Sequence, residues 1–436
     1  MPLIPLLTTW LIGWLVLALL HRPRLGPAAI GTAWLLGTGV VYLAHYGAML
    51  LFQANPPPVL LFAGAAGGAL MLLIKRPAID KAAWQALRRE PLAALLLLGG
   101  VGAVTLVALL NGLGHDGQLI WLGRAIAYHQ IPDYAFHLAR PFPLHPDYPP
   151  LFIHQYQWQF NFTESVAGLK LPGLAFYLTT LLFIFSLLRG SIQSPVKWTL
   201  LAALLPIYWN QTPMAQADIP LGAFIIGSVY WLHTYLRTRQ AADWRVGVGL
   251  AAFIPAVKFE GLVIIACLVL VLLGMMWRWH DARPYLRRMF ISVIIAAGFT
   301  ALMWYGITLT VGAPAGDFSL SHPRPGEFVS ALVGLPLMLL SPYGFHAIWY
   351  VFVAAIIWRR PRIDTITLFW LLPLLYAGAM LAAYLFSNWI DLTHHMRTSY
   401  YRLLLQMTPL VMVWLGWTLA DPVSTLTPDE ATADQK

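Results

Sequence analysis

The chain has 436 residues, of which 59% are hydrophobic and 10% charged, and its formal net charge is +9. This composition excludes nearly every class of soluble protein and predicts an all-α, polytopic membrane protein. The basic residues lie between apolar runs, so the positive charge indicates membrane topology, and nucleic acid is not among the expected partners. The single cysteine, Cys267, excludes a disulfide or a cysteine-based metal site within the chain.

About fourteen apolar segments are long enough to cross a bilayer, or nearly so. In chain order they are 2–20, 27–52, 59–74, 91–110, 166–188, 197–209, 218–236, 246–257, 261–277, 289–311, 328–341, 344–358, 364–386 and 400–419. Segment 246–257 is too short for an untilted span, and 328–341 ends at a Ser-Pro pair, so we expect a partial or re-entrant helix among them. Residues 3–20 lack a basic n-region and a cleavage site, which predicts a retained span.

The basic residues predict which side of the membrane each loop occupies. If the segments alternate, one side collects nineteen Lys and Arg residues. The opposite side holds only Arg124, Arg140, Lys170, Arg324, Arg397 and Arg402, with Lys258 near a segment end. The first side is therefore expected to be cytoplasmic, and loop 111–165 extracytoplasmic. The same count requires segment 328–341 to lie along the outer surface or to re-enter from it.

The longest polar interruption of the apolar sequence runs from residue 111 to 170. Its ionisable residues include His115, Asp116, His129, Asp133, His137, His145, Asp147, His154 and Glu164. Because binding and catalytic residues concentrate in loops, we expect the chemistry of the protein in this segment.

Two short helices are predicted within this loop. Asp116 precedes the first, whose shared apolar face is formed by Leu119, Leu122 and Ile126. Trp121 and Tyr128 suit the membrane interface, so this helix is expected on the outer leaflet. The alternative for Asp116 is that it only caps this helix. The second helix follows the proline-rich HPDYPPL, where an aromatic residue recurs every four positions at Tyr148, Phe152, Tyr156 and Phe160. Such a stripe is more often packing than sugar binding.

Two further ionisable motifs are expected at the outer ends of spans. Asp218 begins the span 218–236 in QADIPLGAF, where capping is again an alternative because Pro220 falls in the first helical turn. Lys258 and Glu260 lie in VKFEG between two apolar segments. Ionisable groups at membrane depth are costly and usually functional, although Lys258 could instead extend to the interface.

The last motif precedes and enters the final span, in NWIDLTHHMRTSYYRLLLQMTP. His395, Ser399 and Arg402 have the spacing of residues that share one helical face. The guanidinium of Arg402 is suited to bind a phosphate, and the alternative is that it anchors the helix end. His394 and His395 are adjacent and diverge on a helix, so a metal pair is not expected there.

The order of these motifs resembles the GT-C superfamily of membrane glycosyltransferases, with the closest likeness to bacterial enzymes of the protein-mannosyltransferase and aminoarabinose-transferase type. The resemblance covers roughly residues 90–410. It implies a catalytic core over residues 91–420 with its large extracytoplasmic loop at 111–165 containing juxtamembrane helices. Residues 1–90 would then be additional N-terminal transmembrane helices, and 421–436 a disordered cytoplasmic tail.

The resemblance also implies roles for individual residues. Asp116 matches the catalytic aspartate of the family's first loop, whereas Gly117 stands where many members carry a second acid. A divalent cation such as Mg or Mn therefore stays open as a cofactor. Basic residues at the outer face hold a carrier phosphate in this family, which corresponds here to Lys258 and Arg402.

We therefore predict an integral glycosyltransferase of the inner or plasma membrane that uses a polyprenyl-phosphate-linked sugar at the extracytoplasmic face. Its acceptor would be a lipid, protein or glycan hydroxyl. Asp116 would act as general base and Asp218 would position the acceptor or a metal. The residues expected to bind substrate are His145, Asp147, Tyr148, Lys258, Glu260, His395, Ser399 and Arg402.

Two other classes remain open from the sequence. A transporter or lipid flippase would use Asp116, Asp218, Lys258 and Glu260 as an ion relay. A transporter should carry charges near mid-span, whereas these carboxylates are expected at the outer ends of spans. Many transporters are also built from internal repeats, and no repeat is visible in this sequence. A non-catalytic scaffold would leave the ionisable loop unexplained.

Overall fold

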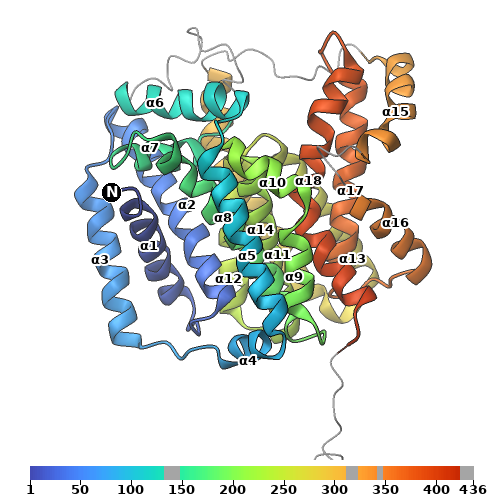
Figure 1. Cartoon of the computed structure of the whole chain (residues 1–436), viewed down its shortest axis with the longest axis horizontal. Helices are drawn as coiled ribbons and strands as arrows, with labels where there is room; N and C mark the ends of the chain where they lie inside the picture. The colour runs from blue at the N-terminus through green and yellow to red at the C-terminus, as the bar shows by residue number, and fades with distance from the viewer. Residues whose placement is uncertain (132–147, 311–322, 341–346, 423–436) are drawn as a thin grey trace, which may run out of the picture.

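The computed structural model describes residues 1–131, 148–310, 323–340 and 347–422. These residues form helices and the loops between them (Figure 1). The N-terminal and middle helices are α1 (Ile4–Leu20), α2 (Pro27–Phe52), α3 (Pro58–Lys75), α4 (Lys81–Arg89), α5 (Pro91–Leu110), η1 (Gly117–Leu122), α6 (Gly123–Gln130), α7 (Leu151–Phe160), α8 (Val166–Leu188), α9 (Pro195–Ala203) and α10 (Pro206–Gln211). The remaining ones are η3 (Thr212–Met214), α11 (Asp218–Thr238), α12 (Ala241–Val257), α13 (Glu260–Arg278), η4 (His280–Ala282), α14 (Arg283–Thr310), α15 (Pro325–Leu339), α16 (Ala347–Arg359), α17 (Thr367–Ala383), η5 (Tyr384–Phe386) and α18 (Leu392–Leu419).

Nine helices of the described chain are long and apolar enough to cross a membrane, so the protein is a multi-pass helical membrane protein. The predicted segments 27–52, 91–110 and 166–188 coincide with α2, α5 and α8. The starts of α2 and α5 are predictable from sequence because each begins with a proline. The N–H that proline lacks would have no partner within the first turn of a helix. In α8 the hydroxyl of Ser165 accepts a hydrogen bond from the Gly168 N–H, which is a standard N-cap.

The expected span 197–209 is instead broken into α9 and α10. Pro206 lacks a backbone N–H and disfavours helical geometry at the preceding Leu205, whose backbone is extended. Helix α15, which covers the segment expected to be partial, has 15 residues and contains Pro336. At 1.5 Å per residue it is shorter than the roughly 30 Å hydrocarbon core. It packs against α18.

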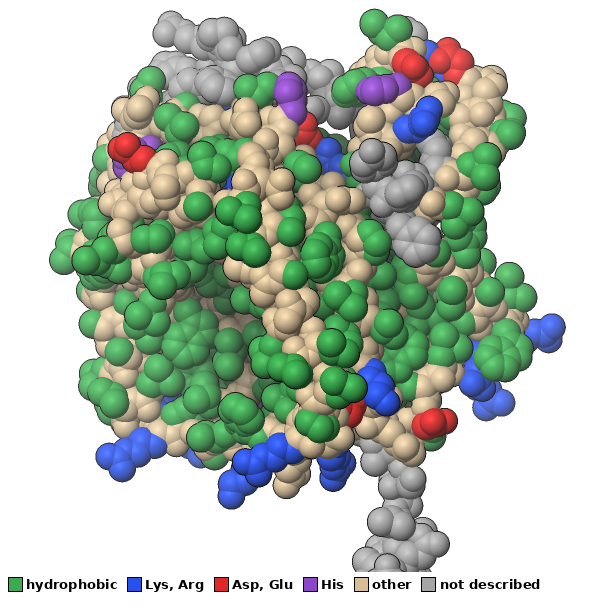
Figure 2. Space-filling model, viewed as in Figure 1, with side chains coloured by type: hydrophobic (Ala, Val, Ile, Leu, Met, Phe, Trp, Pro, Cys, Tyr) green, Lys and Arg blue, Asp and Glu red, His purple; other side chains and the backbone are tan. Residues whose placement is uncertain are grey.

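The two ends of the bundle differ in charge. Helices η1 and α6 lie at one end and α4 lies at the other (Figure 1). Most of the Lys and Arg side chains visible in Figure 2 gather at the end where α4 lies. We call these the α6 end and the α4 end. If the positive-inside rule holds, the α6 end is extracytoplasmic.

Helices α1 to α3 pack with their backbones in direct contact. A Cβ at Gly13 would lie 1.7 Å from the Ala33 carbonyl oxygen, and one at Gly68 would lie 1.9 Å from that of Leu11. Small residues at such positions let membrane helices approach closely. Helix α2 also packs against α8 and α11, so these N-terminal helices share the core of the remaining chain.

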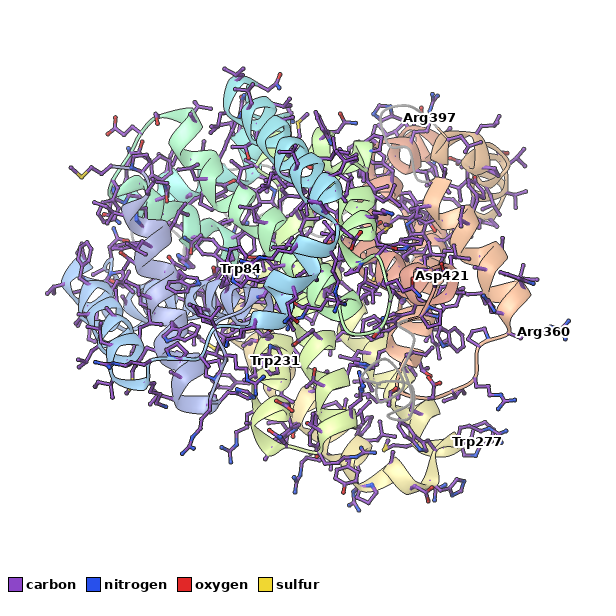
Figure 3. All side chains as sticks on the ribbon, turned by 60° about the horizontal axis from the view of Figure 1, so that its bottom comes forward. Trp84, Trp231, Trp277, Arg360, Arg397 and Asp421 are labelled. Atoms are coloured by element: carbon purple, nitrogen blue, oxygen red, sulfur yellow. The ribbon has the colours of Figure 1, made fainter. Side chains whose placement is uncertain are left out.

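Helix α11 lies at the centre of the bundle and is buried along nearly all its length. In Figure 3, which brings the α4 end forward, Trp231 of α11 lies inside the bundle while Trp277 and Arg360 lie at its rim. The indole N–H of Trp231 donates to the Thr32 hydroxyl of α2 at 2.8 Å. Because α11 is central, the helices that carry other site residues, α12 and α18, both pack against it.

Candidate functional site

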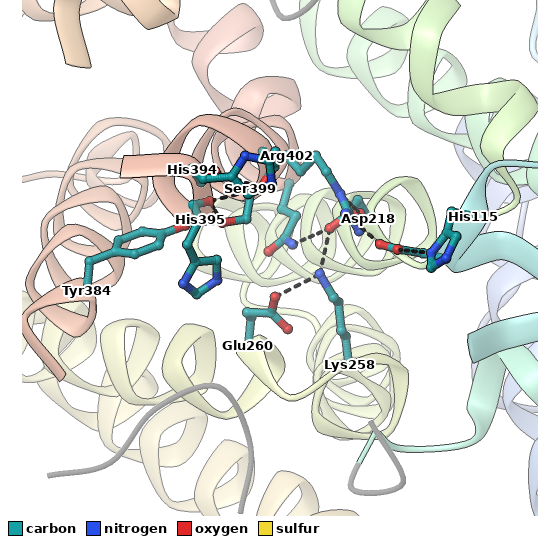
Figure 4. A network of polar contacts seen from close by, with 12 residues as sticks. His115, Asp218, Lys258, Glu260, Tyr384, His394, His395, Ser399 and Arg402 are labelled. Atoms are coloured by element: carbon teal, nitrogen blue, oxygen red, sulfur yellow. Dashed lines mark hydrogen bonds and ion pairs between the residues drawn. The ribbon is translucent and has the colours of Figure 1, made fainter. Parts of the chain in front are cut away.

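A string of ion pairs crosses the α6 end of the bundle (Figure 4). The Arg402 Nη1 group donates to Asp116 Oδ2 at 2.7 Å. Its Nη2 and Nε groups both donate to Asp218 Oδ2, at 3.1 and 3.2 Å. Arg402 therefore joins the first loop, the start of α11 and the last helix, although Asp116 is 286 positions away in sequence.

The string continues through Lys258. Its Nζ group lies 2.9 Å from Asp218 Oδ1 and 2.7 Å from Glu260 Oε1. The amide of Gln406 donates to the same Asp218 oxygen at 2.7 Å. Both oxygens of Asp218 are therefore occupied, and its carboxylate is the centre of the network. We refer to Asp116, Arg402, Asp218, Lys258 and Glu260 as the charged network.

Local structure places these charges at helix ends. Asp218 is the first residue of α11 and Glu260 is the first residue of α13, where the positive end of the helix dipole stabilises a carboxylate. Lys258 directly follows α12 and has an extended backbone. A Cβ at Gly261 would lie 2.2 Å from the Ile254 carbonyl oxygen, so glycine allows α13 to begin close to the end of α12.

Burial divides the charged network into an accessible and an inaccessible part. The side chains of Asp116 and Arg402 are 29% and 16% exposed, whereas those of Asp218, Lys258 and Glu260 are 1%, 4% and 10% exposed. Three carboxylates and two cations give the network a formal charge of −1. The Oε2 atom of Glu260 is buried without a hydrogen-bond partner, so the inaccessible part contains one unsatisfied acceptor.

These contacts decide between the alternatives that the sequence left open. Asp116 and Asp218 make no side-chain capping hydrogen bond, so neither is a simple helix cap. Lys258 is buried and paired and does not extend to the interface. Arg402 lies well inside α18, which begins at Leu392, and it does not merely anchor the helix end.

His395 and Ser399 lie on α18 but outside the charged network. The Ser399 hydroxyl lies 2.6 Å from the Tyr384 hydroxyl, and His395 Nδ1 lies 2.8 Å from the Ser387 hydroxyl. The Trp389 ring stacks on the His395 ring with centroids 4.8 Å apart. The three residues predicted to share one helical face therefore have different partners. Arg402 points to Asp218, whereas His395 and Ser399 contact the segment before α18 (Figure 4).

The prediction that Trp121 and Tyr128 lie exposed at the membrane interface is wrong, because each is 1% exposed. Of the three residues expected to share the apolar face, Leu119 and Ile126 are 39% and 38% exposed and Leu122 is 8% exposed. A π-helical turn over Gly117–Leu122 breaks the 3.6-residue period on which the predicted face depended. Both aromatic residues pack toward α7 instead, with the Tyr128 and His154 ring centroids 5.6 Å apart.

Helix α7 confirms the predicted second loop helix but not its exposure at an interface. Phe152 and Tyr156 are fully buried, with ring centroids 4.5 Å apart, so the aromatic stripe is packing. Burial lowers the pKa of His154 in this helix to about 3, so its imidazole is neutral near pH 7. Tyr148, just before α7, lies under the Lys258 ammonium, whose nitrogen is 5.9 Å from the ring centroid.

Two predicted substrate-binding residues, His145 and Asp147, lie outside the described residues. Among the described ones, the ionisable contacts of Asp116 are Arg402 and His115, whose Nδ1 lies 3.8 Å away. No group of three His, Cys, Asp or Glu residues in the described ranges could hold a metal.

The glycine at position 117 has a steric reason. A Cβ there would lie 2.0 Å from the backbone carbonyl oxygen of Met214, because η1 begins against η3. A second acid directly after Asp116 would therefore displace this contact.

Sequence reasoning missed three residues that support the site. Gln406 lies four positions after Arg402, so helical spacing could have found it. The second is Tyr376, whose hydroxyl donates to Gln406 Oε1 at 2.6 Å. Lys170 is buried in α8 and donates to the Ala108 carbonyl at 2.7 Å, and also to the carbonyls of Asn111 and Gly112. The Lys170 ammonium thereby offsets the negative partial charge at the C-terminal end of α5 and fixes the backbone segment that precedes Asp116.

The fold and this site define a polytopic helical membrane protein with a buried charged network that opens toward one membrane face. No protein-family model matches the chain, and no curated protein or solved structure matches it either. The residues and their geometry therefore carry the functional argument.

Proposed function

We propose that the chain is an integral membrane glycosyltransferase that moves a sugar from a polyprenyl-phosphate-linked donor to an acceptor hydroxyl at the extracytoplasmic face. The observation that carries this proposal is the pair formed by Asp116 and Arg402 at the accessible end of the charged network. Glycosyl transfer needs a carboxylate that takes the acceptor proton and a cation that stabilises the departing phosphate. The pair provides both groups.

In the proposed reaction the acceptor oxygen attacks the anomeric carbon and forms the new glycosidic bond. The bond from that carbon to the phosphate oxygen breaks, and its electron pair leaves with the polyprenyl phosphate. The acceptor proton moves to Asp116 Oδ1, since Oδ2 already accepts from Arg402. Transfer by direct displacement inverts the anomeric centre.

Arg402 has the capacity to hold a phosphate without leaving the network. A guanidinium has five N–H donors, and three of them are used by Asp116 and Asp218. The remaining two, one on each terminal nitrogen, can donate to phosphate oxygens.

Asp218 takes a different role in this proposal from the one expected of it. Its carboxylate is 1% exposed and accepts hydrogen bonds from Arg402, Lys258 and Gln406. It therefore acts as a positioning residue that orients Arg402, and it does not contact the acceptor. Lys258 and Glu260 balance its charge from the inner side, and His395, Ser399 and Tyr148 form the surroundings of the site.

The location of the charges favours an enzyme over a transporter or flippase. Asp218 and Glu260 begin helices, and Lys258 lies between α12 and α13 at the same end of the bundle. An ion relay needs groups distributed across the membrane, whereas these are gathered at one face.

The direct test is incubation of the purified protein with a panel of polyprenyl-phosphate sugars and measurement of released polyprenyl phosphate. We expect release with one donor class, and we expect Asp116→Asn to lose it. Donor that is moved between leaflets of a vesicle without release of carrier phosphate would instead identify a flippase.

The sidedness of the site is tested by topology reporters. A reporter fused near residue 140 or 390 should read as extracytoplasmic, and one near 240 or 282 as cytoplasmic. A cytoplasmic signal at 140 would place Asp116 away from the extracytoplasmic donor and would refute the mechanism.

A further inference from the structure

A second charged site lies at the α4 end, between α1 and α3. It is a cavity of about 360 Å³ lined by Trp14, Ala18, Arg22, Pro23, Lys75 and Pro77. Its volume falls in the range of small-ligand sites, roughly 300–1,000 Å³. None of the described residues that line this cavity carries a carboxylate, and we call it the α1–α3 pocket.

The two cations of the pocket differ in how they are held. Lys75 is the last residue of α3 and donates to the Ala18 carbonyl near the end of α1. An ammonium has three donors, so two remain for a ligand. Arg22 is exposed and makes no ion pair with any described residue.

The nearby acids are not available to neutralise these cations. Asp80 pairs with Arg189, and Asp243 pairs with His21 at 3.0 Å. The pocket therefore has a local positive charge that the described part of the chain does not balance.

A buried aromatic side chain also lines the pocket. Trp14 is 1% exposed and its indole Nε1–H has no hydrogen-bond partner. The nitrogen itself has almost no accessible surface, so Trp14 contributes an aromatic wall to the pocket and not a donor to its contents. The two cations favour an oxyanion.

The walls of the pocket are fixed by backbone contacts. The loop after α1 and the loop after α3 are joined by the Leu25 N–H to the Ala78 carbonyl, at 2.9 Å, and by the Asp80 N–H to the Leu25 carbonyl, at 3.0 Å. Above the pocket, Gly68 brings the α3 backbone against Leu11 of α1. The helices are thus held together on both sides of the opening.

The surrounding surface is that of a lipid-facing helix pair. Leu19 of α1 and Leu70, Leu73 and Ile74 of α3 are 56–71% exposed. Acyl chains can cover these side chains while a headgroup phosphate reaches the pocket.

We infer that the α1–α3 pocket binds the phosphate of an anionic phospholipid from the leaflet at the α4 end. Arg22 and Lys75 would contact the phosphate oxygens, and the Trp14 ring would form part of the wall beside them. This site is separate from the charged network, and it does not depend on the proposed transferase reaction.

The test measures the thermal unfolding of the full chain in phosphatidylcholine bilayers that contain increasing phosphatidylglycerol. We expect phosphatidylglycerol to raise the Tm in a saturable manner, as a ligand of the folded state does. Arg22→Gln/Lys75→Gln should weaken the apparent affinity at least about tenfold, since each charge-assisted contact contributes substantially.

The matched control is Arg88→Gln/Arg89→Gln on α4, which removes the same charge from exposed residues outside the pocket. It should leave the apparent affinity unchanged. An equal loss in the control would mean general attraction to the anionic surface and would overturn the proposal. The same Tm rise with inorganic phosphate alone would identify a free-anion site and also overturn it.

Discussion

The charged network and the α1–α3 pocket are both built from cations near the membrane surface, but their partners differ. In the network each cation is paired with two carboxylates, whereas the pocket cations face none. The pocket can therefore hold an anion statically. In the network an anion has to compete with carboxylates, one of which we propose as the acceptor of a proton. The comparison therefore contrasts a proposed binding site with a proposed site of turnover.

The largest expected effect concerns the buried part of the network. Lys258→Met would leave Asp218 and Glu260 buried with one cation fewer, which costs about 3–5 kcal/mol. We expect a large fall in thermal stability, measured in detergent at matched lipid content. Lys258→Met/Glu260→Gln removes one buried charge of each sign and should recover part of the loss. A single variant as stable as wild type would contradict the ion pairs of Figure 4.

The next effect separates catalysis from stability at the accessible end. Asp116→Asn keeps the size of the side chain but cannot take the acceptor proton, so turnover should fall at least about 100-fold. The Tm should change little, because Asp116 caps no helix and its pair with Arg402 is partly exposed. Turnover is measured at saturating donor with matched expression. Near wild-type turnover would move the base elsewhere, with Asp147 as the next candidate.

A smaller effect is expected for donor binding at Arg402. Arg402→Ala removes the proposed phosphate contact and should weaken the donor Kd by roughly 10- to 100-fold. Arg402→Lys should recover only part, because an ammonium cannot reproduce the planar donor arrangement of a guanidinium. Binding is measured with a non-transferable donor analogue. An unchanged Kd in the alanine variant would restrict Arg402 to holding Asp116 and Asp218 together.

The smallest effect concerns the close approach that positions Asp116. Gly117→Ala places a Cβ against the Met214 carbonyl and should cost about 1–3 kcal/mol of stability, with a parallel loss of turnover. Gly112→Ala is the control, because a Cβ at that position meets no atom within 4 Å. Equal behaviour of the two variants would show that the contact between η1 and η3 does not position Asp116.

Much of the fold was predictable because a membrane-spanning helix appears in the sequence as one continuous apolar stretch. The apolar runs of α2, α5 and α8 gave their boundaries, since length and hydropathy suffice to define a span. The membership of the network was also predictable in part. Asp218, Lys258, Glu260 and Arg402 lie within or at the ends of apolar sequence, where ionisable residues are costly and usually functional. Asp116 lies in the polar segment 111–170 and was predicted from its place before a loop helix.

The parts that failed involve irregular or short elements. The π-helical turn at Gly117–Leu122 shifted the buried face of the loop helix toward Trp121, and Pro206 divided an expected span. The π-helical turn leaves no signal in hydropathy or helical spacing, whereas Pro206 is visible within the segment 197–209 and could have predicted the break. His395 and Ser399 contact the segment before α18, which helical spacing alone could not reveal, and their binding of substrate stays a prediction.

The sequence by itself determined that this is a multi-pass helical membrane protein and that its ionisable residues gather at span ends. It could do so because the bilayer excludes charge along a local stretch of chain. Only the tertiary structure decided that Asp218 is the shared centre of the network, that Arg402 reaches Asp116, and that Arg22 and Lys75 meet beside Trp14. Those contacts join residues from different helices, and their partners are set by helix packing rather than by any local pattern.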